Sequence, residues 1–168
     1  PLKAGPHALY RIYSMTKPIT GVAMMQLYEK GLWKLDDPVT KFVPELTNLK
    51  VYKGRDADGK ELLVNANRPA TMREIMTHTA GLGYGLSAGN PVDEAFAKLN
   101  PLGTADMQTM IDTVSQLPLL AQPGERWSYS IAVDIQGLIV ERLSGEKFGQ
   151  YLQNHIFKPL GMRETRFF

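Results

Sequence analysis

The longest apolar stretch of the chain covers residues 18–32 and predicts one buried helix. Between positions 19 and 28, the only residues that are not apolar are Thr20, Gly21 and Gln26. A helix that is apolar on almost every side has to be covered by protein on almost every side. We therefore expect this helix to lie in the core with a sheet packed against it.

Helical patterns and turn signals alternate along the rest of the chain, and together they predict roughly six helices. Two alternating runs on either side of Asp58-Gly59 predict a β-hairpin over residues 49–64. Thr71 and Thr104 are expected to cap the helices that follow them. After the first helix, the predicted helices cover residues 36–43, 71–76, 92–99, 104–114, 131–143 and 147–157.

Length and composition indicate a single domain over residues 1–168 with a substantial core. There is no cysteine, so disulfides and thiolate metal sites are unavailable, and the compartment stays open. The formal charge is +2 without a run of Lys or Arg, which argues against nucleic-acid binding. No apolar run reaches the roughly 20 residues of a membrane span. Because the chain starts at Pro1 and not at methionine, we expect it to be an excised piece.

Ser14 and Lys17 stand just before the long apolar segment. Residues three apart lie on the same side of a helix, so the two side chains should face each other across its first turn. A serine hydroxyl becomes an effective nucleophile only when a nearby base takes its proton. The free N–H groups of a helix start favour a nucleophile that develops negative charge. This placement predicts that Ser14 is a nucleophile and Lys17 its proton partner.

The Ser-x-x-Lys spacing alone is not decisive, because a chain of this length contains roughly one by chance. A second pair, Ser144 and Lys147, follows a helical pattern with Gly145 between its members. Glycine commonly ends a helix, so we expect Ser144 and Lys147 on either side of a break.

A rival nucleophile is Ser87, which lies in a Gly-x-Ser-x-Gly stretch over residues 85–89. Asp134 and His155 follow in the chain order of an α/β-hydrolase triad. That motif needs a strand before the serine and a helix directly after it. Here glycines precede Ser87 and Asn90-Pro91 follow, so a loop is the favoured interpretation.

Three histidines, His7, His78 and His155, have no partner at metal-binding spacing, which makes a zinc site improbable. His78 follows an apolar helix and is expected to be a hydrogen-bonded structural residue. Tyr129 lies in a Trp-Ser-Tyr-Ser cluster before a helix. A phenol beside a lysine ammonium can have its pKa lowered enough to transfer protons, although a packed aromatic ring is the common role of such a residue.

Four stretches carry a further signal: residues 10–20, 78–82, 123–130 and 157–162. In this order they resemble the class C β-lactamase-related serine hydrolases, and most of all the bacterial esterases with a β-lactamase fold (family VIII-like). The similarity covers nearly the whole chain, which makes it more specific than any one motif. The resemblance implies an α/β fold of the β-lactamase/transpeptidase type, of which this chain carries the mainly helical portion.

The resemblance also implies roles for individual residues. Ser14 would be the acylated nucleophile, Lys17 its proton partner, and Tyr129 the base that activates first Ser14 and then water. The loop over residues 81–91 would border the pocket. The substrate-binding positions would be Tyr84, Ser130 and Ile131, with no cofactor and no metal.

Two departures from the family pattern bear on this expectation. The β-lactamases of the family carry Asn where this chain has Ile131, which favours ester over β-lactam substrates. Their third motif, on a sheet strand, would follow Phe168, so most of the sheet and half of the oxyanion hole are expected to come from the remainder of the protein's own chain.

A serine carboxylesterase acting on small-molecule esters is therefore the favoured function. A β-lactamase or D,D-peptidase is the enzymatic alternative, and a non-catalytic scaffold of the same fold is the alternative from another class. Retention of Ser14, Lys17 and Tyr129 together argues against the scaffold, because a scaffold has no physical need for all three.

Overall fold

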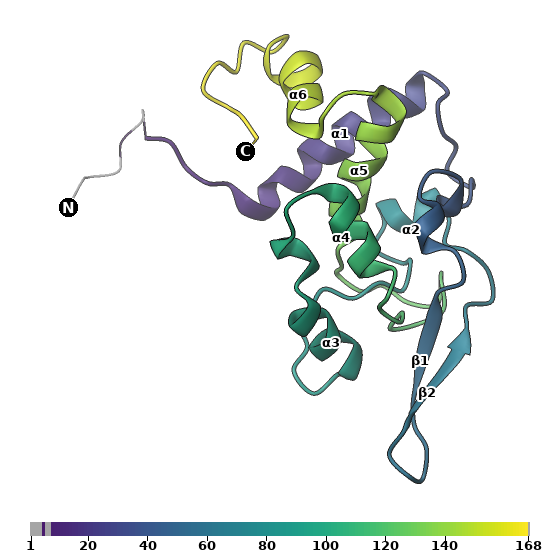
Figure 1. Cartoon of the computed structure of the whole chain (residues 1–168). Helices are drawn as coiled ribbons and strands as arrows, with labels where there is room; N and C mark the ends of the chain where they lie inside the picture. The colour runs from purple at the N-terminus through teal and green to yellow at the C-terminus, as the bar shows by residue number, and fades with distance from the viewer. Residues whose placement is uncertain (1–4, 6–7, 168) are drawn as a thin grey trace.

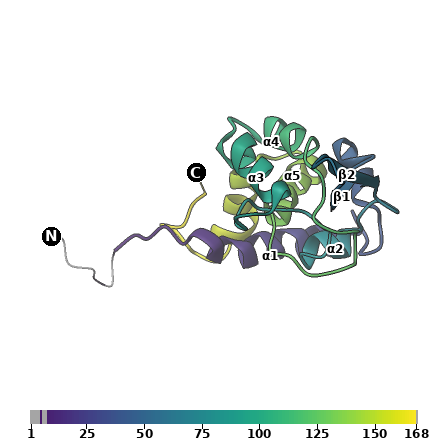
Figure 2. The same ribbon diagram turned by 90° about the horizontal axis from the view of Figure 1, so that it is seen from below.

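A computed structural model describes residues 5 and 8–167 of the chain. Helices make up most of the described part, and one β-hairpin projects from it (Figure 1). Helix α5 (Ala132–Ser144) lies between α1 (Thr16–Glu29) and α4 (Met107–Val114), as Figure 2 shows. The other helices are α2 (Met72–Met76), α3 (Pro91–Leu99) and α6 (Phe148–Leu152).

Helix α5 is the centre of the core. Seven of its residues are buried, and it packs against α1, α2, α4 and α6. Gln136, a polar residue on its buried surface, donates a hydrogen bond to the carbonyl oxygen of Ile75 at 3.1 Å. The helix ends at Gly145, whose φ of 74° lies in the left-handed region that glycine adopts without strain.

Helix α1 differs from its prediction in its start. It begins at Thr16, two residues early, after a short 3₁₀ turn over Tyr13–Met15. One side of it is buried against α5 and α6, whereas Val22 is 48% and Met25 40% exposed. The described residues include no sheet against α1, so cover on almost every side, with most of the sheet in the remainder of the protein's own chain, stays a prediction.

The predicted hairpin is confirmed, with antiparallel strands β1 (Lys50–Arg55) and β2 (Glu61–Asn65). The ladder is irregular between Tyr52 and Arg55. Leu119 closes the outer edge of β1, since its carbonyl oxygen accepts from the N–H of Tyr52 at 2.9 Å and its own N–H donates to the carbonyl oxygen of Lys50 at 2.7 Å. These two bonds tie the hairpin to the body of the protein.

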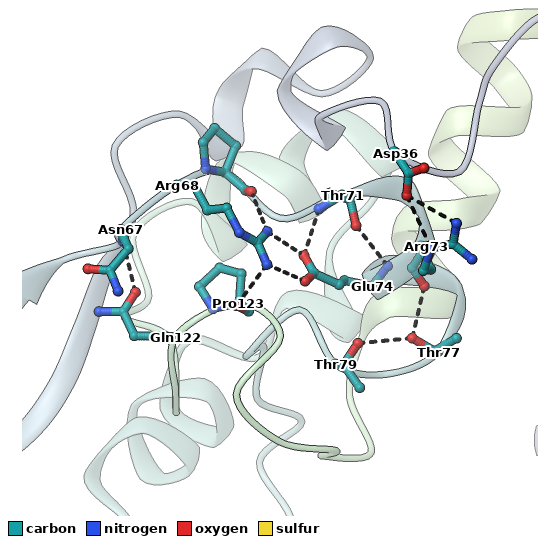
Figure 3. Close-up of polar contacts among 11 residues, drawn as sticks. Asp36, Asn67, Arg68, Thr71, Arg73, Glu74, Thr77, Thr79, Gln122 and Pro123 are labelled. Atoms are coloured by element: carbon teal, nitrogen blue, oxygen red, sulfur yellow. Dashed lines mark hydrogen bonds and ion pairs between the residues drawn. The ribbon is translucent and has the colours of Figure 1, made fainter.

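Helix α2 begins with the predicted cap at Thr71. The hydroxyl of Thr71 accepts from the N–H of Glu74, and the Glu74 carboxylate accepts from the N–H of Thr71, so two free donors at the helix start are satisfied. The same carboxylate forms a two-bond ion pair with Arg68, which also donates to the carbonyl oxygen of Pro123 (Figure 3).

The helix predicted over residues 36–43 is wrong in type. Two 3₁₀ turns, Val39–Lys41 and Pro44–Leu46, take its place. The N–H of Val39 donates to the carbonyl oxygen of Ala70, which is distant in sequence. This bond keeps the backbone in an extended conformation at Pro38, just before the first turn. Pro44 starts the second turn instead of ending a helix, because a proline at the first helical position loses no needed donor.

Three more helices differ from their predictions. Helix α4 is capped by Asp106, which accepts from the N–H of Thr109 at 2.7 Å, and not by Thr104, whose hydroxyl donates to the carbonyl oxygen of Pro101. The last predicted helix is split into α6 and a π-helical turn over Gln153–Phe157. Helix α3 begins at Pro91 with Asn90 as its cap, one residue before the predicted start.

The predicted fold class is confirmed: the described part is a mainly helical portion of an α/β fold with six α-helices and one small hairpin. Its longest helix has 14 residues, and none of the described helices could reach across a membrane.

Candidate active site

Ser14, Lys17 and Tyr129 come together at the start of α1. The hydroxyl oxygen of Ser14 lies 2.9 Å from the phenolic oxygen of Tyr129. The ammonium of Lys17 donates to the same Ser14 oxygen at 3.2 Å, so the two side chains face each other across the first turn as the spacing predicts. Ser14 thus holds hydrogen bonds to two groups that can exchange protons.

The path of the backbone explains this meeting. Ser14 lies in the 3₁₀ turn Tyr13–Met15, which the N–H of Met15 closes by donating to the carbonyl oxygen of Ile12 at 3.0 Å. Ser14 is therefore presented on the solvent side of a helix start and not within the helix.

Tyr129 reaches the site from a segment 115 positions further along the chain than Ser14. It follows a tight turn at Gly124, whose φ is 85°. A Cβ atom at Gly124 would lie 2.7 Å from Glu74 Oε1 and 2.9 Å from Arg68 Nη2. The turn is thus pressed against the Arg68–Glu74 ion pair, which Figure 3 shows beside Pro123. The left-handed backbone favours glycine here, and a side chain would also have to displace the ends of Glu74 and Arg68 at the start of the segment that carries Tyr129.

An aromatic cluster surrounds the ring of Tyr129. The His78 ring is stacked on it, with centroids 5.1 Å apart and an angle of 26°. Tyr84 meets it edge-on at 5.3 Å, and Trp127, which is 64% exposed, lies at 6.4 Å. The ammonium of Lys17 lies 4.7 Å from the ring centroid. These contacts fix the plane of the phenol and leave its oxygen directed at Ser14.

The charges around the site favour the ionised phenol. The side chain of Lys17, followed by that of Ser14, holds the pKa of Tyr129 below its usual value, and the negative charge of Asp134 partly opposes this. Burial raises the pKa of Asp134, an effect that the Lys17 charge partly offsets. Burial also raises the pKa of Tyr84, which keeps that phenol protonated. Tyr129 is therefore the phenol of this cluster that is suited to act as a base.

Of the three predicted substrate-binding positions, only Tyr84 offers surface to a ligand. Ile131 is fully buried, and its N–H donates to the carbonyl oxygen of Gly83 at 3.1 Å. Ser130 is 1% exposed, and its hydroxyl lies 3.0 Å from Nδ1 of His78. Direct substrate contact by Ser130 and Ile131, both buried directly after Tyr129 in the chain, stays a prediction.

The rival triad is not assembled. Ser87 lies in a loop without the strand and helix that the motif needs. His155 is hydrogen-bonded to Glu146 at 2.6 Å. Asp134 interacts electrostatically with Tyr129 and with Lys17. In the second Ser-x-x-Lys, the Ser144 hydroxyl donates to Val140 while Lys147 pairs with Glu141, as expected for residues separated by a helix end.

Asp93 and Asp134 shape the site, and their roles were not predicted. Asp93 is 4% exposed, and its carboxylate accepts from the N–H groups of Tyr84, Gly85 and Ser87 at 2.8–3.2 Å. It thereby anchors the loop that carries Tyr84. The sequence signal is weak, because an acidic residue in a first helical turn is common for reasons of helix charge alone.

No three His, Cys, Asp or Glu side chains within residues 5 and 8–167 gather closely enough to hold a metal ion. His7 lies outside the described residues. A cavity of about 380 Å³ lies beside the base of the hairpin, with Leu49, Ala80 and Leu119 in its lining; Ser14, Lys17 and Tyr129 are not part of it.

Comparison with known proteins identifies the family. A sequence profile described as Beta-lactamase matches residues 1–168. The chain belongs to this family. It is 36% identical over 162 residues to esterase EstB of Burkholderia gladioli, an alignment that covers 95% of this chain and 38% of EstB.

Solved structures that are similar to this chain share its fold. Unliganded simvastatin synthase (LovD) of Aspergillus terreus is 33% identical and matches with a TM-score of 0.73 over 90% of this chain and 38% of that one. EstCE1, described as a hydrolase with promiscuous acyltransferase activity, is 30% identical with a TM-score of 0.68 over 88% and 36%. The chain therefore spans little more than a third of the length of these relatives.

Proposed function

We propose that the protein is a serine hydrolase that cleaves carboxylic esters through an acyl-enzyme on Ser14. The observation that carries this proposal is the position of the Ser14 oxygen, 2.9 Å from the phenol of Tyr129 and 3.2 Å from the ammonium of Lys17. Family membership supports acyl transfer in general, and the esterase relatives support an ester substrate.

Acylation uses the lowered pKa of Tyr129. Its phenolate takes the proton of Ser14 while the Ser14 oxygen bonds to the ester carbonyl carbon. When the tetrahedral intermediate collapses, the bond to the alkoxy oxygen breaks and Tyr129 returns the proton to the departing alcohol. Lys17 is the partner in this proton transfer: its ammonium, bonded to the Ser14 oxygen and 4.7 Å from the Tyr129 ring centroid, stabilises the phenolate at the start and end of the step.

Deacylation repeats the sequence with water in place of Ser14. Tyr129 takes a proton from water while the water oxygen attacks the acyl carbon. When the bond between the acyl carbon and the Ser14 oxygen breaks, Tyr129 passes that proton to Ser14. An alcohol could take the place of water, which would make the reaction an acyl transfer. The EstCE1 description names both activities for that protein, so transfer to an alcohol is a second candidate for this chain.

The β-lactamase and D,D-peptidase alternatives share the same acyl-enzyme. They are separated from the proposed function by comparing kcat/KM for nitrophenyl butyrate with kcat/KM for a chromogenic cephalosporin. We expect preference for the ester, and preference for the cephalosporin would assign a lactamase instead. A scaffold protein would turn over neither substrate.

A fluorophosphonate probe tests the nucleophile, because it reacts covalently with an activated serine. In the full-length protein we expect label on the peptide that contains Ser14. Ser14→Ala should abolish both labelling and ester hydrolysis, whereas Ser87→Ala should keep both. Label on Ser87 would refute the proposal.

A further inference from the structure

His78 has a backbone conformation that is rare for a residue with a side chain. Its φ is 58°, in the left-handed region, where histidine is one of the few tolerated residue types besides glycine. It lies between α2 and Gly81, half-buried beneath Tyr129. This conformation lets the backbone and the ring of His78 contact the same neighbouring segment.

His78 holds that segment on both sides of Tyr129. Its carbonyl oxygen accepts from the N–H of Ser128 at 2.9 Å, and its Nδ1 accepts from the N–H of Ser130 at 3.2 Å. Both residues that flank Tyr129 in the chain are therefore bonded to this one residue. The third contact is the stacking of the His78 ring on the ring of Tyr129.

These bonds determine the proton positions on the ring. A backbone N–H only donates, so Nδ1 of His78 carries the lone pair and the ring proton lies on Nε2. The Ser130 hydroxyl, 3.0 Å from the same Nδ1, accepts from the N–H of Ala132 at 3.4 Å and has its own proton free to donate to the ring. The bond from the N–H of Ser130 therefore exists only while Nδ1 is unprotonated.

We propose that His78 is a positioning residue for Tyr129 and that efficient acyl transfer requires its uncharged ring. This inference rests on the proposed function of Ser14 and Tyr129. A proton on Nδ1 can donate to the Ser130 hydroxyl oxygen but faces the N–H of Ser130 as a second donor, so the backbone bond from Ser130 would be lost. Tyr129 would then lose one of the two backbone supports that aim its oxygen at Ser14.

The surroundings keep the ring neutral. Burial first, and then the positive charge of Lys17 on α1, hold the pKa of His78 below its usual value of 6.5. Tyr129 is the titratable group stacked on the ring, and Tyr84 from the loop before α3 and Asp134 in the first turn of α5 act on Tyr129 in turn. The pKa of His78 is thus lowered by its surroundings, which favours the uncharged ring.

Two substitutions separate the contacts of His78. His78→Asn keeps an acceptor close to the place of Nδ1 and tolerates a left-handed backbone, but it does not titrate. His78→Phe keeps a ring to stack on Tyr129 but offers no acceptor to Ser130. His155→Asn is the matched control, since His155 lies in the π-helical turn over Gln153–Phe157 and is hydrogen-bonded to Glu146.

The experiment measures ester hydrolysis by the full-length variants from pH 5 to 9. For His78→Phe we expect kcat to fall by about 10²-fold, the cost of a small misplacement of a catalytic group, with little change in KM. For wild type, log kcat/KM should fall on the acid side with a slope of one from Tyr129 and of two once His78 is protonated. His78→Asn should keep most of the activity at neutral pH and show the slope of one only.

The results have distinct meanings. Near-normal kcat in His78→Phe, or an acid limb of unchanged shape in His78→Asn, would overturn the positioning role. Failure of the fluorophosphonate to label Ser14 in wild type would instead overturn the proposed function. His155→Asn should match wild type throughout. Since His78→Asn remains active at neutral pH, loss of folding in His78→Phe would leave the pH profile as the deciding test.

Discussion

The phenolic oxygen of Tyr129 lies 2.9 Å from the hydroxyl of Ser14, although 115 positions separate the two residues. Tyr129→Phe removes only that oxygen and keeps the ring that His78 and Tyr84 contact. Because general-base catalysis contributes about 10²–10⁴-fold, kcat on a nitrophenyl ester should fall by that factor.

Stability should change little in Tyr129→Phe, as measured by thermal unfolding, since the removed oxygen is near the surface. Tyr28→Phe, which changes a phenol packed near Trp33, should retain wild-type kcat. A Tyr129→Phe variant with wild-type kcat would reduce Tyr129 to a packing residue.

Lys17 should set the pH at which Tyr129 becomes active. Its side chain is the largest influence that lowers the Tyr129 pKa, so Lys17→Gln should let that pKa rise. A base with a raised pKa is protonated up to a higher pH, and the acid limb of kcat/KM should therefore move to more alkaline pH. The measurement is a pH–rate profile of the full-length protein. Lys41→Gln, which changes an exposed lysine paired with Asp37, should leave the limb in place, and an unmoved limb in Lys17→Gln would contradict this account.

Local signals were sufficient to predict the elements whose causes are local. The Ser-x-x-Lys spacing fixes Ser14 and Lys17 on one side of a helical turn wherever that turn lies. Thr71 and Glu74 satisfy each other within four residues. The hairpin follows from alternation around Asp58-Gly59. Resemblance to a family, and not periodicity, added Tyr129 to this set.

Elements that depend on distant partners were not predictable in this way. The conformation of the 36–43 segment depends on Ala70, whose carbonyl oxygen accepts a hydrogen bond from the N–H of Val39. Among the described residues, α5, with a glutamine on its buried surface, is better covered than α1, whose apolar sequence anticipates partners beyond those residues. The positions of His78 and Asp93 arise from bonds to loops whose course no sequence period specifies.

The ion pair between Glu45 and Arg142 should make stability depend on pH. Hydrogen bonding to Arg142, against an opposing effect of burial, lowers the pKa of Glu45 from 4.5 to about 2. A carboxyl group with a lowered pKa stabilises the fold fully above its unfolded value, near 4.5, and this contribution is lost as the pH falls towards 2. The side chains of Glu45 and Arg142 are only 19% and 26% exposed, so solvent screens their interaction little. The shift in the Glu45 pKa then corresponds to about 3 kcal/mol of folding stability at pH 7.

Glu45→Gln should therefore lower the free energy of unfolding by about 2–3 kcal/mol at pH 7, and the difference from wild type should narrow below pH 4.5. Urea unfolding at several pH values measures this. Asp36→Asn is the control, because the side chains of Asp36 and its partner Arg73 are 80% and 53% exposed. Loss of this exposed ion pair should change the free energy of unfolding by less than about 1 kcal/mol. A difference that stays constant down to pH 3 would show that Glu45 acts through packing and not through its charge.

The turn at Gly124 links stability to activity. Alanine there would adopt a left-handed backbone at a cost of about 1–2 kcal/mol, and its Cβ would also press on Glu74 and Arg68. Gly59→Ala provides a control for the first effect alone, because its φ of 80° is similar and nothing lies within 4 Å of the added atom.

Both variants should lose stability, but Gly124→Ala should lose more, and only Gly124→Ala should lower kcat, since the displaced turn begins the segment that carries Tyr129. Thermal unfolding and ester hydrolysis of the full-length variants give both quantities. Equal stability losses would mean that the ion pair yields to the methyl group. Unchanged kcat in a destabilised Gly124→Ala would mean that the contacts of His78 with Ser128 and Ser130 hold Tyr129 in place without help from the turn.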